Sequence, residues 1–113
     1  MDALLGAARI GDIGKLFPDT DPAYLNISSI ELLKKVKELL SSSGWRVLDV
    51  DCVIIAQQPR LSPFRSEMQE NIANALELQP SQVGIKATTS EHLGFEGRGE
   101  GISAHAVALL EEE

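Results

Sequence analysis

The sequence contains very little that could form covalent cross-links or a catalytic nucleophile pair. Its one cysteine, Cys52, excludes a disulfide within the chain and is typical of a reducing compartment. Its two histidines, His92 and His105, are isolated; we expect the first in a solvated loop and the second in packing or a subunit contact. No Ser-His-Asp order, Cys-His pair or zinc-ribbon spacing is present, so nothing predicts covalent catalysis.

Positive charge is also scarce. Lys and Arg total 10 against 17 Asp and Glu, and the net charge of −7 argues against nucleic acid or a membrane surface as partner. No apolar run reaches the roughly 20 residues that a membrane helix needs, and Met1-Asp2 lacks the basic start of a signal peptide. We expect a cytoplasmic protein whose residues 1–113 form a single domain. A phosphorylated metabolite could still bind to local cations, for which the candidates are Lys15, Arg60, Lys86 and Arg98.

Capping residues and hydrophobic periodicity predict the order helix, helix, strand, helix, strand, strand. Ser28 with Glu31 predicts a capping box for a helix that stops at Gly44. Ser62 before Pro63 predicts an N-cap followed by proline at the first helical position. The six elements are expected at residues 1–9, 28–42, 45–57, from 62 onward, 83–88 and 102–110, and residues 111–113 are expected to be an acidic tail.

The segment 45–57 is the clearest strand, because apolar residues occupy both of its faces. One face is predicted to carry Leu48, Val50, Cys52, Ile54 and Ala56. Together these elements predict the α/β class, more narrowly an α+β sandwich with a mixed β-sheet and helices packed on one face.

Three segments between these elements carry groups that suit ligand binding. Residues 11–22 read GDIGKLFPDTDP, whose carboxylates either cap helices and shape turns or accept hydrogen bonds from polyol hydroxyls. Residues 56–62 read AQQPRLS and are either a plain connection or an anion site made of backbone amides and Arg60. Residues 86–101 read KATTSEHLGFEGRGEG and are either a structural glycine-rich turn after a strand or a site for a phosphate and a divalent cation, which hydroxyls, Glu91, Arg98 and four glycines would suit.

The two long runs, residues 11–22 and 86–101, closely resemble the 2-C-methyl-D-erythritol 2,4-cyclodiphosphate synthase family of the non-mevalonate isoprenoid pathway. The resemblance covers nearly all of the chain. It implies a homotrimer with sites at subunit interfaces and a small cytidine diphosphate substrate. It also implies metal-assisted intramolecular phosphoryl transfer, in which the substrate's own phosphate displaces CMP, so that no protein nucleophile is needed.

Residue by residue, the resemblance implies three groups of functional positions. Substrate polyol and ribose would be bound by the first run, at Asp12, Ile13, Gly14, Phe17, Pro18, Asp19, Thr20 and Asp21. Cytosine and its phosphate would be bound by Ala56, Gln57, Gln58, Pro59, Arg60, Leu61 and Ser62. The diphosphate would be bound by Thr88, Thr89, Ser90 and Glu91, and Phe95 and Arg98 would lie near the central cavity of the homotrimer. Thr89 and Glu91 are the expected catalytic residues, with Glu91 binding Mg²⁺ or Mn²⁺.

The zinc ion of the family is a different matter. The resemblance places its three protein ligands, an Asp-x-His pair and a later histidine, in a stretch that would precede Met1. Two interpretations follow from this. The chain represents the synthase without part of its length, corresponding to the C-terminal two-thirds or more of such a domain, or it is a catalytically inactive, trimer-forming nucleotide-binding remnant.

Overall fold

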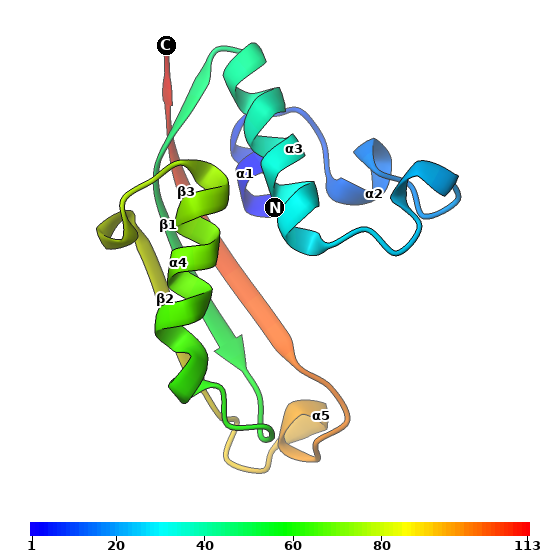
Figure 1. Cartoon of the computed structure of the whole chain (residues 1–113). Coiled ribbons are helices and arrows are strands. Elements are labelled where there is room, and N and C mark those ends of the chain that lie inside the picture. The colour runs from blue at the N-terminus through cyan, green and yellow to red at the C-terminus, as the bar shows by residue number, and fades with distance from the viewer.

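The computed structural model of the protein describes residues 1–113 and is built on a three-stranded sheet (Figure 1). Its strands are β1 (Trp45–Ile55), β2 (Val83–Thr88) and β3 (Ser103–Glu112), in the order β2-β1-β3. β1 pairs with β2 in parallel and with β3 antiparallel, which confirms the predicted mixed sheet. Because β1 and β2 are parallel, their carboxyl ends lie at the same edge of the sheet.

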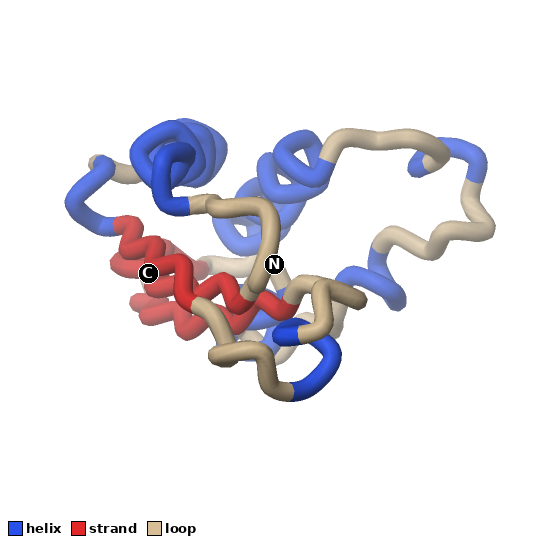
Figure 2. The backbone as a smooth tube through the Cα atoms, turned by 90° about the horizontal axis from the view of Figure 1, so that it is seen from below, coloured by secondary structure: helices blue, strands red, loops and turns tan.

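Three helices cover one face of this sheet (Figure 2). They are α1 (Asp2–Ala7), α3 (Ser29–Ser42) and α4 (Arg65–Leu76). Buried leucines and valines from α1, α3 and β1 form the main core, and a smaller cluster joins α4 to β2. The remaining helices are single turns: α2 (Ile13–Leu16), α5 (Gly94–Gly97), and the 3₁₀ turns η1 (Pro22–Tyr24), η2 (Ser62–Phe64) and η3 (Pro80–Gln82).

The face assignment predicted for the long strand is wrong at its beginning. A bulge shifts the register between Val47 and Asp49, so Val47 and Val50 both enter the core, at 7% and 6% exposure. Leu48, which the alternation placed on the same face as Val50, is only half-buried. Strict period-two counting fails here because a bulge inserts one residue and inverts the sides that follow.

Two predicted helix starts also need correction. Ser28 does cap α3, but its hydroxyl accepts from the Ile30 N–H at 3.2 Å, while Glu31 pairs with Lys34 instead of completing a capping box. Ser62 caps nothing, because residues 62–64 form η2 and α4 begins only at Arg65. The end of α3 at Ser42, just before Gly44, is confirmed.

The acidic end of the chain is part of the sheet, so the predicted tail is wrong. Glu111 lies in β3 opposite Arg46 and forms an ion pair with it, and Glu113 donates its backbone N–H to the carbonyl of Gly44. Cross-strand pairing of opposite charges explains why an acidic segment can remain in a strand.

The face of the sheet away from the helices is open. Val107 and Leu109 of β3 are 75% and 59% exposed on it, with His105 nearby on the same side of the strand. Asp51 of β1 lies on this face and pairs with Lys86 at 3.3 Å. None of the helices is long and apolar enough to cross a membrane.

Candidate functional site

Two of the three candidate segments meet at the carboxyl ends of β1 and β2. The N–H of Ala56 donates to the carbonyl of Thr88 at 3.0 Å, which extends the parallel pairing by one residue. A pocket of about 150 Å³ lies at these strand ends, which are at the lower end of the molecule in Figure 1. It is lined by Ala56, Gln57, Pro59, Arg60, Leu61, Ser62, Ala87, Thr88 and Thr89.

The segment 56–62 offers this pocket an accessible positive charge. Arg60 is exposed and forms no ion pair with any carboxylate of the chain. The helical turns that follow, η2 and α4, have no side-chain cap at their starts. Uncapped backbone N–H groups at the start of a helix attract anions, and α4 has the length to carry a helix dipole. The arrangement therefore suits a phosphate beside Arg60.

The loop after β2 turns sharply at Glu91 and His92. Both residues adopt the left-handed conformation, with φ of 55° and 62°. The hydroxyl of Thr89 accepts from the Glu91 N–H at 3.2 Å, and Ser90 donates its hydroxyl to the carbonyl of Leu93 at 2.6 Å. The Glu91 carboxylate has no hydrogen-bond or ion-pair partner within the chain, so it is free to bind a ligand or an ion.

A glycine makes this turn possible. A Cβ at Gly97 would lie 2.2 Å from the carbonyl carbon of His92 and 2.5 Å from its Cα, so only glycine lets α5 pack against the turn. Glu96 of α5 accepts a hydrogen bond from the Ser103 hydroxyl at 2.8 Å, which fixes the far side of the loop. The backbone of the Glu91 loop is thus held from both ends.

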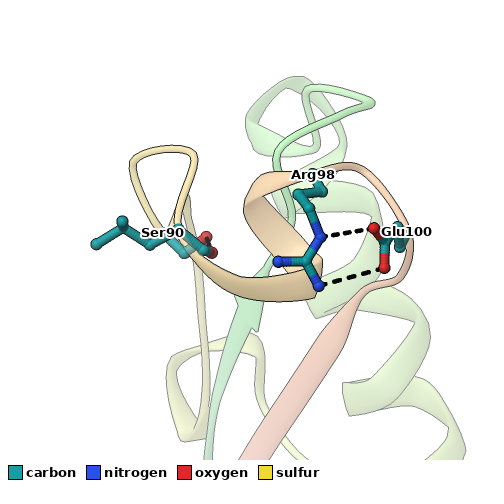
Figure 3. A network of polar contacts seen from close by, with 4 residues as sticks. Ser90, Arg98 and Glu100 are labelled. Carbon is teal, nitrogen blue, oxygen red and sulfur yellow. Dashed lines mark hydrogen bonds and ion pairs between the residues drawn. The ribbon is translucent and has the colours of Figure 1, made fainter.

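Phe95 lies in α5, and Arg98 follows its last residue. Arg98 donates from Nε to Glu100 at 2.6 Å, as Figure 3 shows, so part of its charge is compensated locally. Phe95 is 46% exposed, and its ring lies over Gly101, with a ring carbon 3.1 Å from where a Cβ would be. Neither residue lines the pocket.

The third segment, residues 11–22, lies apart from the other two (Figure 1). Asp12 caps α2 by accepting from the Lys15 N–H at 2.9 Å, and Asp21 caps η1 by accepting from the Ala23 N–H at 2.9 Å. Phe17 stacks edge-on against Tyr24 with ring centroids 5.3 Å apart. Asp12 and Asp21 thus cap helical turns, which was one of the two roles predicted for the aspartates of this segment. The other predicted residues of the segment lie beside them: Ile13, Gly14, Pro18, Asp19 and Thr20.

The donor set fits one of the two expected metals. Mg²⁺ and Mn²⁺ are commonly held by one or two carboxylates together with substrate phosphate oxygens. Glu91 does not line the pocket, but it follows the pocket-lining Thr89 by two residues, and its free carboxylate meets that need. Zinc requires three protein ligands, and nowhere in the chain do three His, Cys, Asp or Glu side chains gather to hold a metal. The residues present therefore do not fit a zinc site.

Two groups with a shifted pKa, Cys52 and Glu77, lie outside this region. Burial raises the pKa of the Cys52 thiol, which lies on the face of the sheet that the helices cover. The hydrogen bond and charge of Lys37 lower the pKa of Glu77. Neither group is near the pocket, so neither shift bears on the candidate chemistry.

Sequence reasoning missed three contributors to the site. Gly97 is one, Glu100 as the partner of Arg98 is another, and the third is a hydrogen bond from the His92 N–H to the Gln57 side chain at 3.2 Å. The glycine-rich run was a signal for the first. Nothing in the sequence indicated that residues 57 and 92 touch.

Comparison with known proteins shows the family of this chain. The chain matches the YgbB family along residues 1–111. It is 59% identical over 110 residues to the 2-C-methyl-D-erythritol 2,4-cyclodiphosphate synthase of Pelotomaculum thermopropionicum, covering 97% of this chain and 68% of that protein. It is 60% identical over 109 residues to the protein of that name from Syntrophotalea carbinolica, covering 96% of this chain and 66% of that one.

Solved structures show the same fold. The bifunctional IspDF of Campylobacter jejuni superimposes with a TM-score of 0.94 at 43% identity, over 99% of this chain and 30% of that one. IspF of Plasmodium falciparum, solved as a CDP complex, superimposes with a TM-score of 0.85 at 32% identity, over 99% of this chain and 67% of that one. The fold and site thus define a mixed α/β protein of the cyclodiphosphate synthase type.

The chain belongs to the YgbB family, and its curated homologues are named 2-C-methyl-D-erythritol 2,4-cyclodiphosphate synthase. It spans about two-thirds of the length of the curated relatives given above.

Proposed function

We propose that this chain carries the cytidine phosphate and divalent-cation part of a cyclodiphosphate synthase site. The reaction converts 4-diphosphocytidyl-2-C-methyl-D-erythritol 2-phosphate to 2-C-methyl-D-erythritol 2,4-cyclodiphosphate and CMP. The observation that carries the proposal is the meeting of residues 56, 57 and 59–62, Arg60 among them, with Thr88 and Thr89 in one pocket. The Glu91 loop follows directly and is bonded to Thr89. The names of the curated relatives and the CDP in the Plasmodium falciparum structure point to the same ligand.

The bond changes need no nucleophile from the protein. An oxygen of the substrate's 2-phosphate forms a bond to the diphosphate phosphorus next to methylerythritol, and the bond from that phosphorus to the CMP oxygen breaks. Catalysis then consists of holding the two phosphates in line and stabilising the charge that builds on their oxygens. In this chain, Arg60 would hold the phosphate that leaves with CMP, and the Thr89 hydroxyl would donate to a non-bridging oxygen of the phosphate that is attacked.

Glu91 would hold Mg²⁺ or Mn²⁺ against the diphosphate. The bound cation supplies charge neutralisation between the two phosphates. The contribution of the chain is the position of Glu91, in a left-handed turn where its N–H is bonded to the hydroxyl of the pocket-lining Thr89. The zinc of the family enters no step here, because the chain offers no ligand set for it.

We also propose that the chain assembles as a homotrimer. The open face of the sheet, with Val107 and Leu109 exposed, supports a homotrimer in which the loops of neighbouring subunits complete each site. The separation of residues 11–22 from the pocket within one chain supports the same idea, since a polyol-binding loop would then belong to a site shared between subunits. We place this trimer in the cytoplasm, where a reduced Cys52 is expected.

One observation favours a second function. Since the 113 residues contain no three-ligand metal cluster, they could bind the cytidine nucleotide and assemble without turning substrate over. Such a remnant would keep the pocket, Arg60 and Glu91, and would hold no stoichiometric zinc.

The deciding experiment is CMP release from the cytidine diphosphate substrate by this chain with Zn²⁺ and Mg²⁺, beside the Pelotomaculum thermopropionicum enzyme. Turnover near that control supports the synthase. CMP binding without turnover supports the remnant, and absence of both binding and turnover contradicts the proposal.

Two variants separate the roles within the site. Glu91→Gln should reduce Mg²⁺-dependent turnover far more than CMP affinity. Arg60→Ala should weaken CMP binding about 10-fold to 100-fold, the usual range for a lost hydrogen bond to a charged group. Equal losses of turnover and affinity in Glu91→Gln, or unchanged CMP affinity in Arg60→Ala, would contradict this division.

A further inference from the structure

The only side-chain hydrogen bond between the nucleotide loop (residues 56–62) and the cation loop (residues 89–93) joins Gln57 to His92. The half-buried Gln57 side chain accepts from the His92 backbone N–H through Oε1, at 3.2 Å. Its neighbour Gln58 is exposed and forms no hydrogen bond through its side chain. The two loops are 35 residues apart in the sequence, so this contact exists only in the folded protein.

The bond is made at the point where the cation loop is under strain. Glu91 and His92 are successive non-glycine residues with positive φ, a conformation that persists only where its surroundings enforce it. Thr89 supports the turn from within the same loop, and Gly97 supports it from α5. Gln57 is the support that comes from the nucleotide loop.

We propose that Gln57 is a positioning residue that couples nucleotide binding to cation binding. This inference rests on the proposed function, in which Gln57 lines the cytidine pocket and Glu91 holds the cation. A cytidine in the pocket orders the nucleotide loop and with it the Gln57 amide. The ordered amide favours the left-handed turn that presents the Glu91 carboxylate.

Coupling of this kind acts in both directions with one factor. If cytidine raises the affinity of the protein for the cation by some factor, the cation raises the affinity for cytidine by the same factor. One neutral hydrogen bond sets the size, so we expect a factor of about 3 to 10.

Cytidine is the right probe, because CMP carries a phosphate that would bind the cation directly and mask the effect. Mn²⁺ affinity of the intact chain is measured by electron paramagnetic resonance with and without saturating cytidine. Cytidine affinity is measured by calorimetry with and without Mn²⁺. Each experiment gives a ratio, the affinity for one ligand with the other ligand present divided by the affinity without it. In the unsubstituted protein, the two ratios should agree and lie between about 3 and 10.

Three variants test the residue. Gln57→Met keeps the length of the side chain and removes the acceptor, so both ratios should fall to about 1. Gln57→Glu restores an acceptor; its added charge raises Mn²⁺ affinity with and without cytidine alike, so the ratio should recover. Gln58→Met is the matched control and should keep the coupling of the unsubstituted protein, whatever it does to cytidine affinity.

The outcomes separate the two ideas. Binding of both ligands with ratios near 1 in the unsubstituted protein, or coupling that survives in Gln57→Met, overturns the coupling alone. Failure of the unsubstituted protein to bind cytidine or CMP overturns the proposed function and the coupling with it. A purely structural role would lower the melting temperature of Gln57→Met and leave the ratios unchanged, which also overturns the inference.

Discussion

Replacing Gly97 by alanine tests the packing on which the candidate site depends. The added Cβ would lie 2.2 Å, 2.5 Å and 2.9 Å from three backbone atoms of His92. Ordinary contact begins near 3.4 Å, so α5 and the turn would have to separate by roughly 1 Å. Because the obstructing atoms are backbone, no rotamer change relieves the overlap, and overpacking of this kind destabilises by roughly 1–3 kcal/mol.

The same substitution at Gly6 provides the matched control. Gly6 lies in α1, is exposed, and has nothing within 4 Å of the Cβ it would gain. Alanine there should stabilise the helix by about 0.5–1 kcal/mol, because it loses less backbone entropy on folding. The two variants therefore change the same atoms and should shift stability in opposite directions.

Thermal unfolding followed by circular dichroism measures the difference. A domain of this size shifts its melting temperature by roughly 4 °C for each kcal/mol, so Gly97→Ala should melt about 4–12 °C below the unsubstituted protein and Gly6→Ala slightly above it. Because the loop can also open locally, hydrogen exchange at the His92 N–H should accelerate in Gly97→Ala only. Unchanged melting together with unchanged exchange would refute the described packing of α5 on the turn.

Two further predictions concern the body of the fold. Leu5 of α1 is fully buried, so Leu5→Ala should lower the free energy of unfolding by about 2–5 kcal/mol in urea titrations. Leu25→Ala, at a 72% exposed position, is the control and should change that free energy by less than about 0.5 kcal/mol. Equal effects would show that α1 is not part of the core. Lys37 lowers the pKa of Glu77, so their bond stabilises the protein above the unfolded-state pKa of Glu77 and is lost as pH falls through its folded-state pKa. The stability gap between the unsubstituted protein and Lys37→Met should therefore close in acid, and an NMR titration should show the Glu77 pKa rising in that variant; a gap independent of pH would contradict the assignment.

The sequence was sufficient for the elements whose signals are local. The end of α3 before Gly44 and the bounds of β2 follow from residues within a few positions of each other, and both are confirmed. Family membership was also readable from the two long runs, because many residue identities in order are far more specific than periodicity. Local signals were weakest at Ser28 and Ser62, where several acceptors or turn types compete for the same backbone groups.

The tertiary structure decided what no local pattern encodes. The bulge between Val47 and Asp49 depends on pairing with β3, and the ion pair that draws Glu111 into the sheet depends on Arg46, 65 residues away. Parallel pairing of β1 with β2 brings residues 56–62 to Thr88 and Thr89, and it leaves residues 11–22 elsewhere in the same chain. The sequence by itself determined which groups could bind phosphate and cation. Only the fold decided which of them share a pocket, because contacts between distant residues arise from packing and not from spacing.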